Sequence, residues 1–172
     1  MLRPYGLVME FRKQSIKTSV VACIIDEQER VLLTRRCIHP FCGQWVMPGG
    51  KIDLGEAILE ALHREVREEV GIEVRVEGLI DVFEHLQVGS DREHFVILYY
   101  RAAPLSGELR PNGVECTEAA WIDKERLPAF DLTPGTRHIL AKVFPGVGFG
   151  NGAPPPRSAE GEVPGGSDFQ QN

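Results

Sequence analysis

The chain has 172 residues and a formal net charge of −6, which suits one domain with a sizeable core and is too short for two comfortable ones. The acidic balance argues against binding of a nucleic acid polymer by phosphate neutralisation, but not against binding of a single nucleotide. No run approaches the roughly 18 apolar residues of a membrane span, the N-terminus lacks a signal-peptide pattern, and the four cysteines form no CxxC pair. We therefore expect a cytoplasmic protein that binds neither a membrane nor a nucleic acid polymer.

The first part of the chain predicts an extension followed by a β-hairpin. Residues 1–14 contain Pro4 and Gly6, which rule out a helix through them, and we assign them as an extension outside the main domain. Residues 18–25 are β-branched and apolar, as in a buried strand. A polar turn separates them from a second predicted strand, residues 30–36.

Two arginines, Arg35 and Arg36, end this second strand. Arginines in such a place are commonly surface residues, but a guanidinium group also binds phosphate oxygens with paired hydrogen bonds. Both are therefore candidates for substrate binding. In the loop that follows, Phe41 and Trp45 are either packed side chains or rings that stack on a base.

A helix with a cluster of acidic residues follows a tight turn at Gly49 and Gly50. Residues 57–70 contain no Gly or Pro and are mostly good helix formers. Three carboxylates at positions i, i+3 and i+4 share one face of this helix beside an apolar stripe; they belong to Glu65, Glu68 and Glu69. Glu-rich helix faces are usually solvated. The alternative is a site for Mg²⁺ or Mn²⁺, which prefer oxygen ligands.

The stretch from residue 50 to residue 72 resembles the signature of the Nudix hydrolases: Gly, five residues, Glu, seven residues, then Arg-Glu-apolar-any-Glu-Glu-any-Gly-apolar. Every fixed position is filled without a gap, by Gly50, Glu56, Arg64, Glu65, Val66, Glu68, Glu69, Gly71 and Ile72. Such a long, gapless match is highly specific, and the similarity to the wider domain covers residues 15–144. It implies an α/β fold, the Nudix α/β/α sandwich with a mixed curved β-sheet between helices.

The resemblance also implies a metal site for Mg²⁺, for which Mn²⁺ can substitute. In relatives, a further carboxylate often reaches the metal from the loop before a Trp-containing strand. Glu115 has the spacing to Trp121 found in mutator-type relatives, and Glu118 is the alternative. The ligands expected by resemblance are the Gly49 carbonyl and the carboxylates of Glu65, Glu68, Glu69 and Glu115.

Three further roles follow from the resemblance together with side-chain chemistry. A carboxylate would take a proton from the attacking water, and either Glu68 or Glu115 is expected to be this base. Arg64 would pair with Glu56 and hold the junction between loop and helix. Gly50 would let the backbone approach the substrate closely.

Beyond the helix, residues 73–86 alternate loosely and predict one long or broken strand. Residues 94–101 predict its antiparallel neighbour, and residues 104–112 predict a loop. His85 and His94 are expected to face each other across the hairpin. They are either hydrogen-bonded polar groups near a site, which is the commoner case, or a general base or metal pair.

The C-terminal part predicts a second helix and a tail. Thr133 followed by Pro134 is a strong helix start, and the helix is expected to continue to Phe144. Asp131 precedes it, where mutator-type relatives place a base-reading Asn or Asp, and is therefore a candidate substrate-binding residue. Residues 145–172 are rich in Gly and Pro with little apolar surface, the composition of a disordered tail.

The resemblance implies hydrolysis of a phosphoanhydride bond in a nucleoside diphosphate linked to another group. The first expected substrate is a nucleoside triphosphate such as oxidised dGTP, which would give a nucleoside monophosphate and pyrophosphate. The alternative is ADP-ribose or another sugar nucleotide, although the Pro that often follows the signature in ADP-ribose enzymes is absent near Gln87. A second alternative is a module that senses a nucleotide without hydrolysing it; such relatives usually lose a signature carboxylate, and none is lost here. Many relatives are homodimers, and residues 1–14 could mediate this contact.

Overall fold

The computed structural model describes residues 15–39, 41–87 and 93–149. The predicted N-terminal extension and most of the predicted tail lie outside these residues. The elements, in chain order, are β1 (Lys17–Ile24), β2 (Arg30–Arg36), β3 (Trp45–Val46), β4 (Gly49–Lys51), α1 (Ile58–Val70), β5 (Ile72–Gln87), β6 (Glu93–Gly107), β7 (Cys116–Asp123), a 3₁₀ helix (Lys124–Ala129) and α2 (Pro134–Val143).

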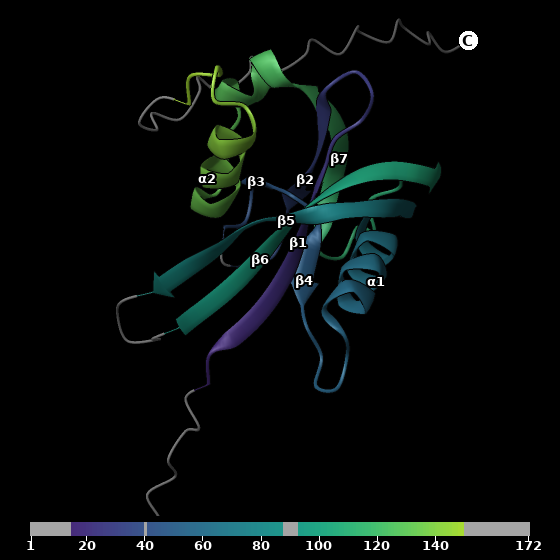
Figure 1. The fold of residues 1–172 in the computed structure, drawn as a ribbon, viewed down its shortest axis with the longest axis vertical. Coiled ribbons are helices and arrows are strands. Elements are labelled where there is room, and N and C mark those ends of the chain that lie inside the picture. Colours follow the sequence, from purple (N-terminus) through teal and green to yellow (C-terminus); the bar gives the residue numbers. More distant parts are fainter. Residues whose placement is uncertain (1–14, 40, 88–92, 150–172) are drawn as a thin grey trace, which may run out of the picture.

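The strands form two sheets, with the orders β4-β1-β6-β5 and β3-β2-β7. In the first sheet β1 runs parallel to β6, while the other neighbours are antiparallel, so this sheet is mixed. The four-stranded sheet lies between α1 and α2 (Figure 1). The predicted mixed α/β sandwich is therefore confirmed, with its strands divided between two sheets.

The uninterrupted apolar sequence at the end of β1 is explained by the helices that cover both faces of its sheet. Val20, Ala22 and Ile24 pack with α1 on one face of the sheet, whereas Cys23 and Ile25 pack with α2 on the other. Because successive side chains of a strand point to opposite faces, a strand covered by a helix on both faces needs apolar residues at every position.

The hairpin of β5 and β6 differs from the prediction in two respects. β6 continues to Gly107, so Pro104 lies in a strand rather than in a loop. The register with β5 shifts between Glu73 and Val74, opposite this proline. A bulge of this kind tolerates a residue without an N–H. The register pairs His85 with Phe95, not with His94. The prediction that the two histidines face each other is wrong, because a slip of one residue turns a side chain to the other face.

The C-terminal helix starts where the sequence predicts, with Thr133 before it and Pro134 as its first residue. After the helix, Val147 and Phe149 pack against the core on the α2 side. The first residues of the segment predicted as a tail therefore contact the domain. No helix in the described part of the chain is long and apolar enough to cross a membrane.

Candidate active site

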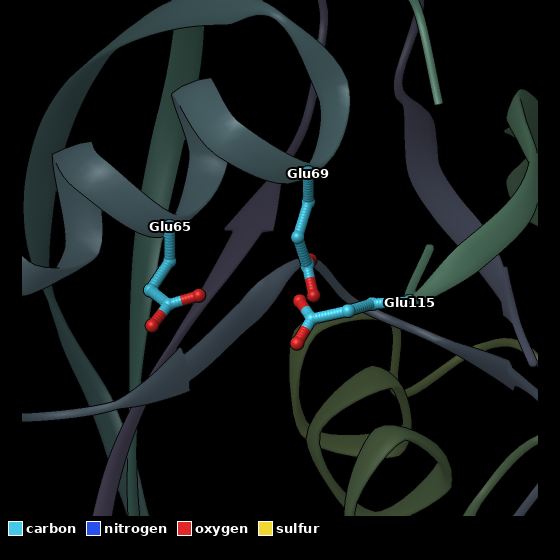
Figure 2. A group of neighbouring side chains, drawn as sticks. All are labelled: Glu65, Glu69 and Glu115. Carbon is cyan, nitrogen blue, oxygen red and sulfur yellow. The ribbon is translucent and has the colours of Figure 1, made fainter. Parts of the chain in front are cut away.

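Three glutamates converge at one place on the surface of α1 (Figure 2). Glu65 and Glu69 lie one turn apart on α1 and are only 9% and 5% exposed, and Glu115 reaches them from the loop before β7. Each offers a carboxylate oxygen, and these oxygens all lie within 4.8 Å of one another. Such a set of oxygen donors matches the preference of Mg²⁺ or Mn²⁺.

Two glycines of β4 let the strand lie close to its neighbours, Gly49 against β1 and Gly50 against the carboxylate of Glu65. Gly49 has a φ of 151°, and a Cβ added there would lie 2.6 Å from the Cα of Val21. Its N–H donates a hydrogen bond of 3.0 Å to Glu69. At Gly50 a Cβ would lie 2.5 Å from the carboxyl carbon of Glu65, so any side chain at this position would displace that carboxylate.

The electrostatics of the cluster are those expected of a site built for a cation. Burial raises the pKa of Glu69 to about 8, the neighbouring Glu115 and Glu65 act in the same direction, and the hydrogen bond from Gly49 opposes them. Burial also raises the pKa of Glu65, although Arg64 opposes this shift. Without a cation Glu69 retains a proton near neutral pH, and a bound divalent ion would displace that proton.

Arg64 connects the loop before α1 to the acidic cluster through hydrogen bonds. Its Nε and Nη2 donate to the two carboxylate oxygens of Glu56 at 2.7 and 2.8 Å, and Nη1 donates to Glu65 at 2.8 Å. Nη2 also donates to the Lys51 carbonyl at 3.1 Å. The hydrogen bond from Arg64 holds the pKa of Glu56 at about 2. The forked pair predicted between Arg64 and Glu56 is therefore present, and it also orients Glu65.

Glu68 does not join the cluster. Its side chain is 61% exposed, and its carboxylate lies 3.4 Å from Nη1 of Arg64. The structure thus brings together three of the four carboxylates expected as ligands.

The other expected substrate-binding residues divide between the cavity beside the cluster and the surface outside it. Arg36 lines the cavity together with Gly50. Arg35 instead donates to Glu118 at 2.8 Å, and neither residue lines the cavity. Asp131 also lies outside, where it accepts a hydrogen bond of 2.9 Å from Gln44.

The cavity has a volume of about 440 Å³ and extends from the acidic cluster to the first turn of α2. Basic side chains of Lys17, Arg36 and Lys51 line it, which suits an anionic ligand. Phe41 also lines it, whereas Trp45 packs edge-to-face on Phe130 with ring centroids 5.3 Å apart.

Apart from His85, which was expected near a site, sequence reasoning missed the floor of this cavity. The floor consists of alternate residues of the sheet, among them Phe83, His85, Phe95, Ile97 and Tyr99. The alternation of β6 already indicates that Phe95, Ile97 and Tyr99 share one face. Which face of the strand meets the cavity depends on the strand partners and on the position of α2, and no local pattern contains that information.

Comparison with known proteins assigns residues 16–143 to the family described as the NUDIX domain. Among solved structures, the MutT NUDIX hydrolase from Burkholderia pseudomallei superposes with a TM-score of 0.70 at 33% identity, over 76% of this chain and 99% of that one. The match thus covers nearly the whole of that hydrolase.

Two curated relatives carry named activities. The 8-oxo-dGDP phosphatase NUDT18 of Homo sapiens is 37% identical over 112 residues, which are 63% of this chain and 33% of that protein. The ADP-ribose pyrophosphatase of Methanocaldococcus jannaschii is 34% identical over 110 residues, which are 63% of this chain and 64% of that protein. The chain therefore spans about a third of the human relative and less than two thirds of the archaeal one.

Proposed function

The chain belongs to the NUDIX domain family, and on this premise we propose that it hydrolyses a phosphoanhydride bond in a nucleoside diphosphate linked to a further group, with Mg²⁺ as cofactor. The observation that carries the proposal is the convergence of Glu65, Glu69 and Glu115 at one end of a cavity of about 440 Å³. A cavity of this size suits a small ligand. Basic residues on its walls suit the phosphates of such a ligand.

In this proposal the side chains bind the metal ion, position a ligand or bind phosphate. Glu65, Glu69 and Glu115, with the Gly49 carbonyl, would hold the ion, which when bound neutralises phosphate oxygens and lowers the pKa of water. Arg64 fixes Glu65 through its bond of 2.8 Å. Arg36 lies where it can bind a phosphate oxygen.

Of the two residues expected as general base, Glu68 is favoured over Glu115. A carboxylate whose oxygens are all engaged by a cation is a poor proton acceptor, and Glu115 belongs to the ligand group. Glu68 lies outside that group, next to Glu69 on α1, with a carboxylate that water can reach.

For the substrate, we place an oxidised purine nucleotide first, such as oxidised dGTP, with a nucleoside monophosphate and pyrophosphate as products. The 37% identity to a relative named 8-oxo-dGDP phosphatase supports an oxidised guanine nucleotide, and the triphosphate follows from the resemblance to mutator-type relatives. ADP-ribose or another sugar nucleotide is the second candidate, supported by the archaeal relative. A module that only senses a nucleotide is disfavoured, because the buried carboxylates of the signature are all in place.

The test is a comparison of kcat/KM for oxidised and ordinary purine nucleoside di- and triphosphates, ADP-ribose and sugar nucleotides, with and without Mg²⁺. Turnover that requires the ion would support the proposal, and the highest kcat/KM identifies the substrate. Absence of phosphate, pyrophosphate or nucleoside monophosphate release from every compound would contradict it.

Replacement of one ligand is the sharper test of the site. Glu69→Gln keeps the size and hydrogen-bonding shape of the side chain but removes the charge that binds the cation, so kcat should fall at least about 100-fold. Glu60→Gln, an exposed change on the same helix, should leave kcat within about twofold. A Glu69→Gln protein with full turnover would refute the assignment, provided that circular dichroism shows the same fold.

A further inference from the structure

The β5–β6 hairpin carries an uncovered apolar patch on the face of the sheet that α1 packs against. On β5, Leu79, Val82 and Leu86 are 51%, 49% and 57% exposed. Val82 pairs with Leu98 of β6, and paired residues lie on the same face; Val96 shares that face because it stands two residues before Leu98. Leu86 lies four residues after Val82, and the partner of Leu79 lies two residues after Leu98, so both share this face as well. We call these five residues the hairpin patch.

The hairpin patch departs from the pattern of a solvated sheet face. Such a face normally places polar residues in alternation with the apolar residues of the covered face. The covered face of this hairpin already has Phe83 and Ile97, which pack against the α2-side core. On the other face, Leu98 packs against the core formed with α1, but the C-terminal end of β5 projects away from α1 (Figure 1). Exposed apolar surface of this kind marks a contact site.

The N-terminal residues 1–14 join the domain beside this patch. The second residue of β1, Thr18, pairs with Val96 of the patch. The patch extends along β5 from Leu79 to Leu86, about 23 Å at a rise of about 3.3 Å per residue. A chain of this length spans up to about 50 Å, so residues 1–14 are long enough to cross the patch. Their connection to β1 also keeps their effective concentration at the patch high.

The composition of residues 1–14 complements the hairpin patch. They include three basic residues against one acidic residue, together with several large apolar side chains. These apolar side chains are Leu2, Leu7, Val8, Met9 and Phe11. On the patch side of β5, Glu84 stands between Val82 and Leu86 with a side chain that is 58% exposed. Apolar surface therefore meets apolar surface, and a basic segment meets a carboxylate.

The C-terminal residues 150–172 match the patch less well. They contain two large apolar side chains, Val163 and Phe169, and one basic residue against three acidic ones. They also follow Phe149, which packs against the core on the other face of the sheet. Of the two ends of the chain, the N-terminal one therefore has both the position and the chemistry to cover the patch.

We propose that residues 1–14 dock on the hairpin patch of their own chain, with apolar side chains against Val82 and Leu86 and a basic side chain beside Glu84. The surface is thus an intramolecular docking site for the N-terminal segment. The opposite face of the same two strands contributes Phe83 and Phe95 to the cavity. The docked segment therefore forms a layer behind the floor of the cavity.

The first test is photocross-linking in the full-length chain. Phe11 is replaced by p-benzoylphenylalanine, which on irradiation forms a covalent bond to a neighbouring C–H group. Cross-links to residues 79–86 or 96–98, recovered from the monomer after denaturing electrophoresis, support docking within one chain. The matched control carries the same replacement at Phe169 and should give no cross-link to these strands. Cross-links from position 169 but not from position 11 would overturn the choice of segment.

The second test changes the patch itself. Leu86→Lys removes an apolar contact and repels the basic segment, so an arginine-specific protease should cleave after Arg12 about 5–10-fold faster, because cleavage follows the population of the released segment. Leu105→Lys is the matched control: this leucine is 59% exposed at the other end of the hairpin, and its replacement should leave the cleavage rate unchanged.

Two results would overturn the proposal. One is an unchanged cleavage rate in Leu86→Lys together with no cross-link from position 11 to the hairpin. The other is a cross-link that joins two chains, which would instead fit the homodimer expected from the family resemblance. Faster cleavage in Leu86→Lys but not in Leu105→Lys, with cross-links inside one chain, supports the docking site.

Discussion

Glu69 carries a carboxylate with 5% exposure beside two further carboxylates. Burial raises its pKa to about 8, and Arg36 lowers it only in part. The folded protein without metal therefore binds a proton at this residue over a pH range in which the unfolded chain has released it. A proton and a divalent cation compete for the same oxygens.

This competition predicts how stability depends on pH. The pKa of Glu69 rises from an ordinary value of 4.5 to about 8, so its contribution to the free energy of unfolding is fully present below pH 4.5 and is lost as pH rises to about 8. The melting temperature of the metal-free protein should fall over this range by more than that of Glu69→Gln. A difference of about 1 kcal/mol would appear as about 2–4 °C.

Mg²⁺ should reverse the trend, because fewer protons have to be displaced at higher pH. The rise in melting temperature on adding Mg²⁺ should be larger at about pH 8 than at about pH 5.5, and Glu69→Gln should show little rise at either pH. Differential scanning fluorimetry across pH, with and without Mg²⁺, measures both effects. Equal pH profiles of wild type and Glu69→Gln would contradict the assigned cause.

Among the elements, the contact between β4 and α1 positions the acidic cluster. Gly50 contributes no side chain, and this absence leaves space for the carboxylate of Glu65. Arg64 of α1 donates hydrogen bonds to the same carboxylate and to the Lys51 carbonyl of β4. Strand and helix therefore fix Glu65 together.

Gly50→Ala should weaken metal binding without unfolding the chain. The new Cβ would lie 2.5 Å from the Glu65 carboxyl carbon, and the side chain of Glu65 must move away. We expect a loss of about 10–100-fold in Mn²⁺ affinity, measured by electron paramagnetic resonance. Gly78→Ala on β5 is the matched control, since a Cβ there meets nothing within 4 Å. Unchanged Mn²⁺ affinity in Gly50→Ala would show that this close approach is not needed.

At the scale of the whole molecule, the domain has apolar cores on both faces of the four-stranded sheet, one with α1 and one with α2. Glu65 and Glu69 of the acidic cluster lie on α1, whereas the hydroxyl of Tyr99 lies beside Gly135 in the first turn of α2. One cavity extends from the acidic cluster to the first turn of α2. Docking of α2 thus completes the cavity as well as the core.

The end of the ordered domain can be tested by truncation. Val147 and Phe149 pack against the α2-side core, whereas the composition of residues 150–172 predicts a disordered tail. A chain ending at residue 149 should keep the melting temperature and kcat of the full chain. A chain ending at residue 144 lacks this buried apolar surface, so its free energy of unfolding should be lower by about 1–3 kcal/mol and its melting temperature should fall. Loss of stability on removing only residues 150–172 would contradict the predicted tail.

The homodimer inferred from the family resemblance, with residues 1–14 as its contact, stays a prediction. Sedimentation of the full chain and of a chain lacking residues 1–14 would test it.

The sequence by itself determined the local elements and the family. Glu65 and Glu69 share a helix face because helical periodicity relates residues four apart, and the start of α2 follows from Thr133 and Pro134. The nine positions of the Nudix signature, from Gly50 to Ile72, all lie within one short stretch, where spacing is a sufficient guide.

Only the tertiary structure decided which distant residues complete the site. Glu115 joins Glu65 and Glu69, while Glu118 turns to Arg35. The Tyr99 hydroxyl reaches the first turn of α2. The physical reason is that a strand exposes alternate side chains to opposite faces, so a shift of one residue in register reverses every assignment. Register, parallel pairing of β1 with β6 and the position of α2 result from contacts between distant segments, which local spacing does not encode.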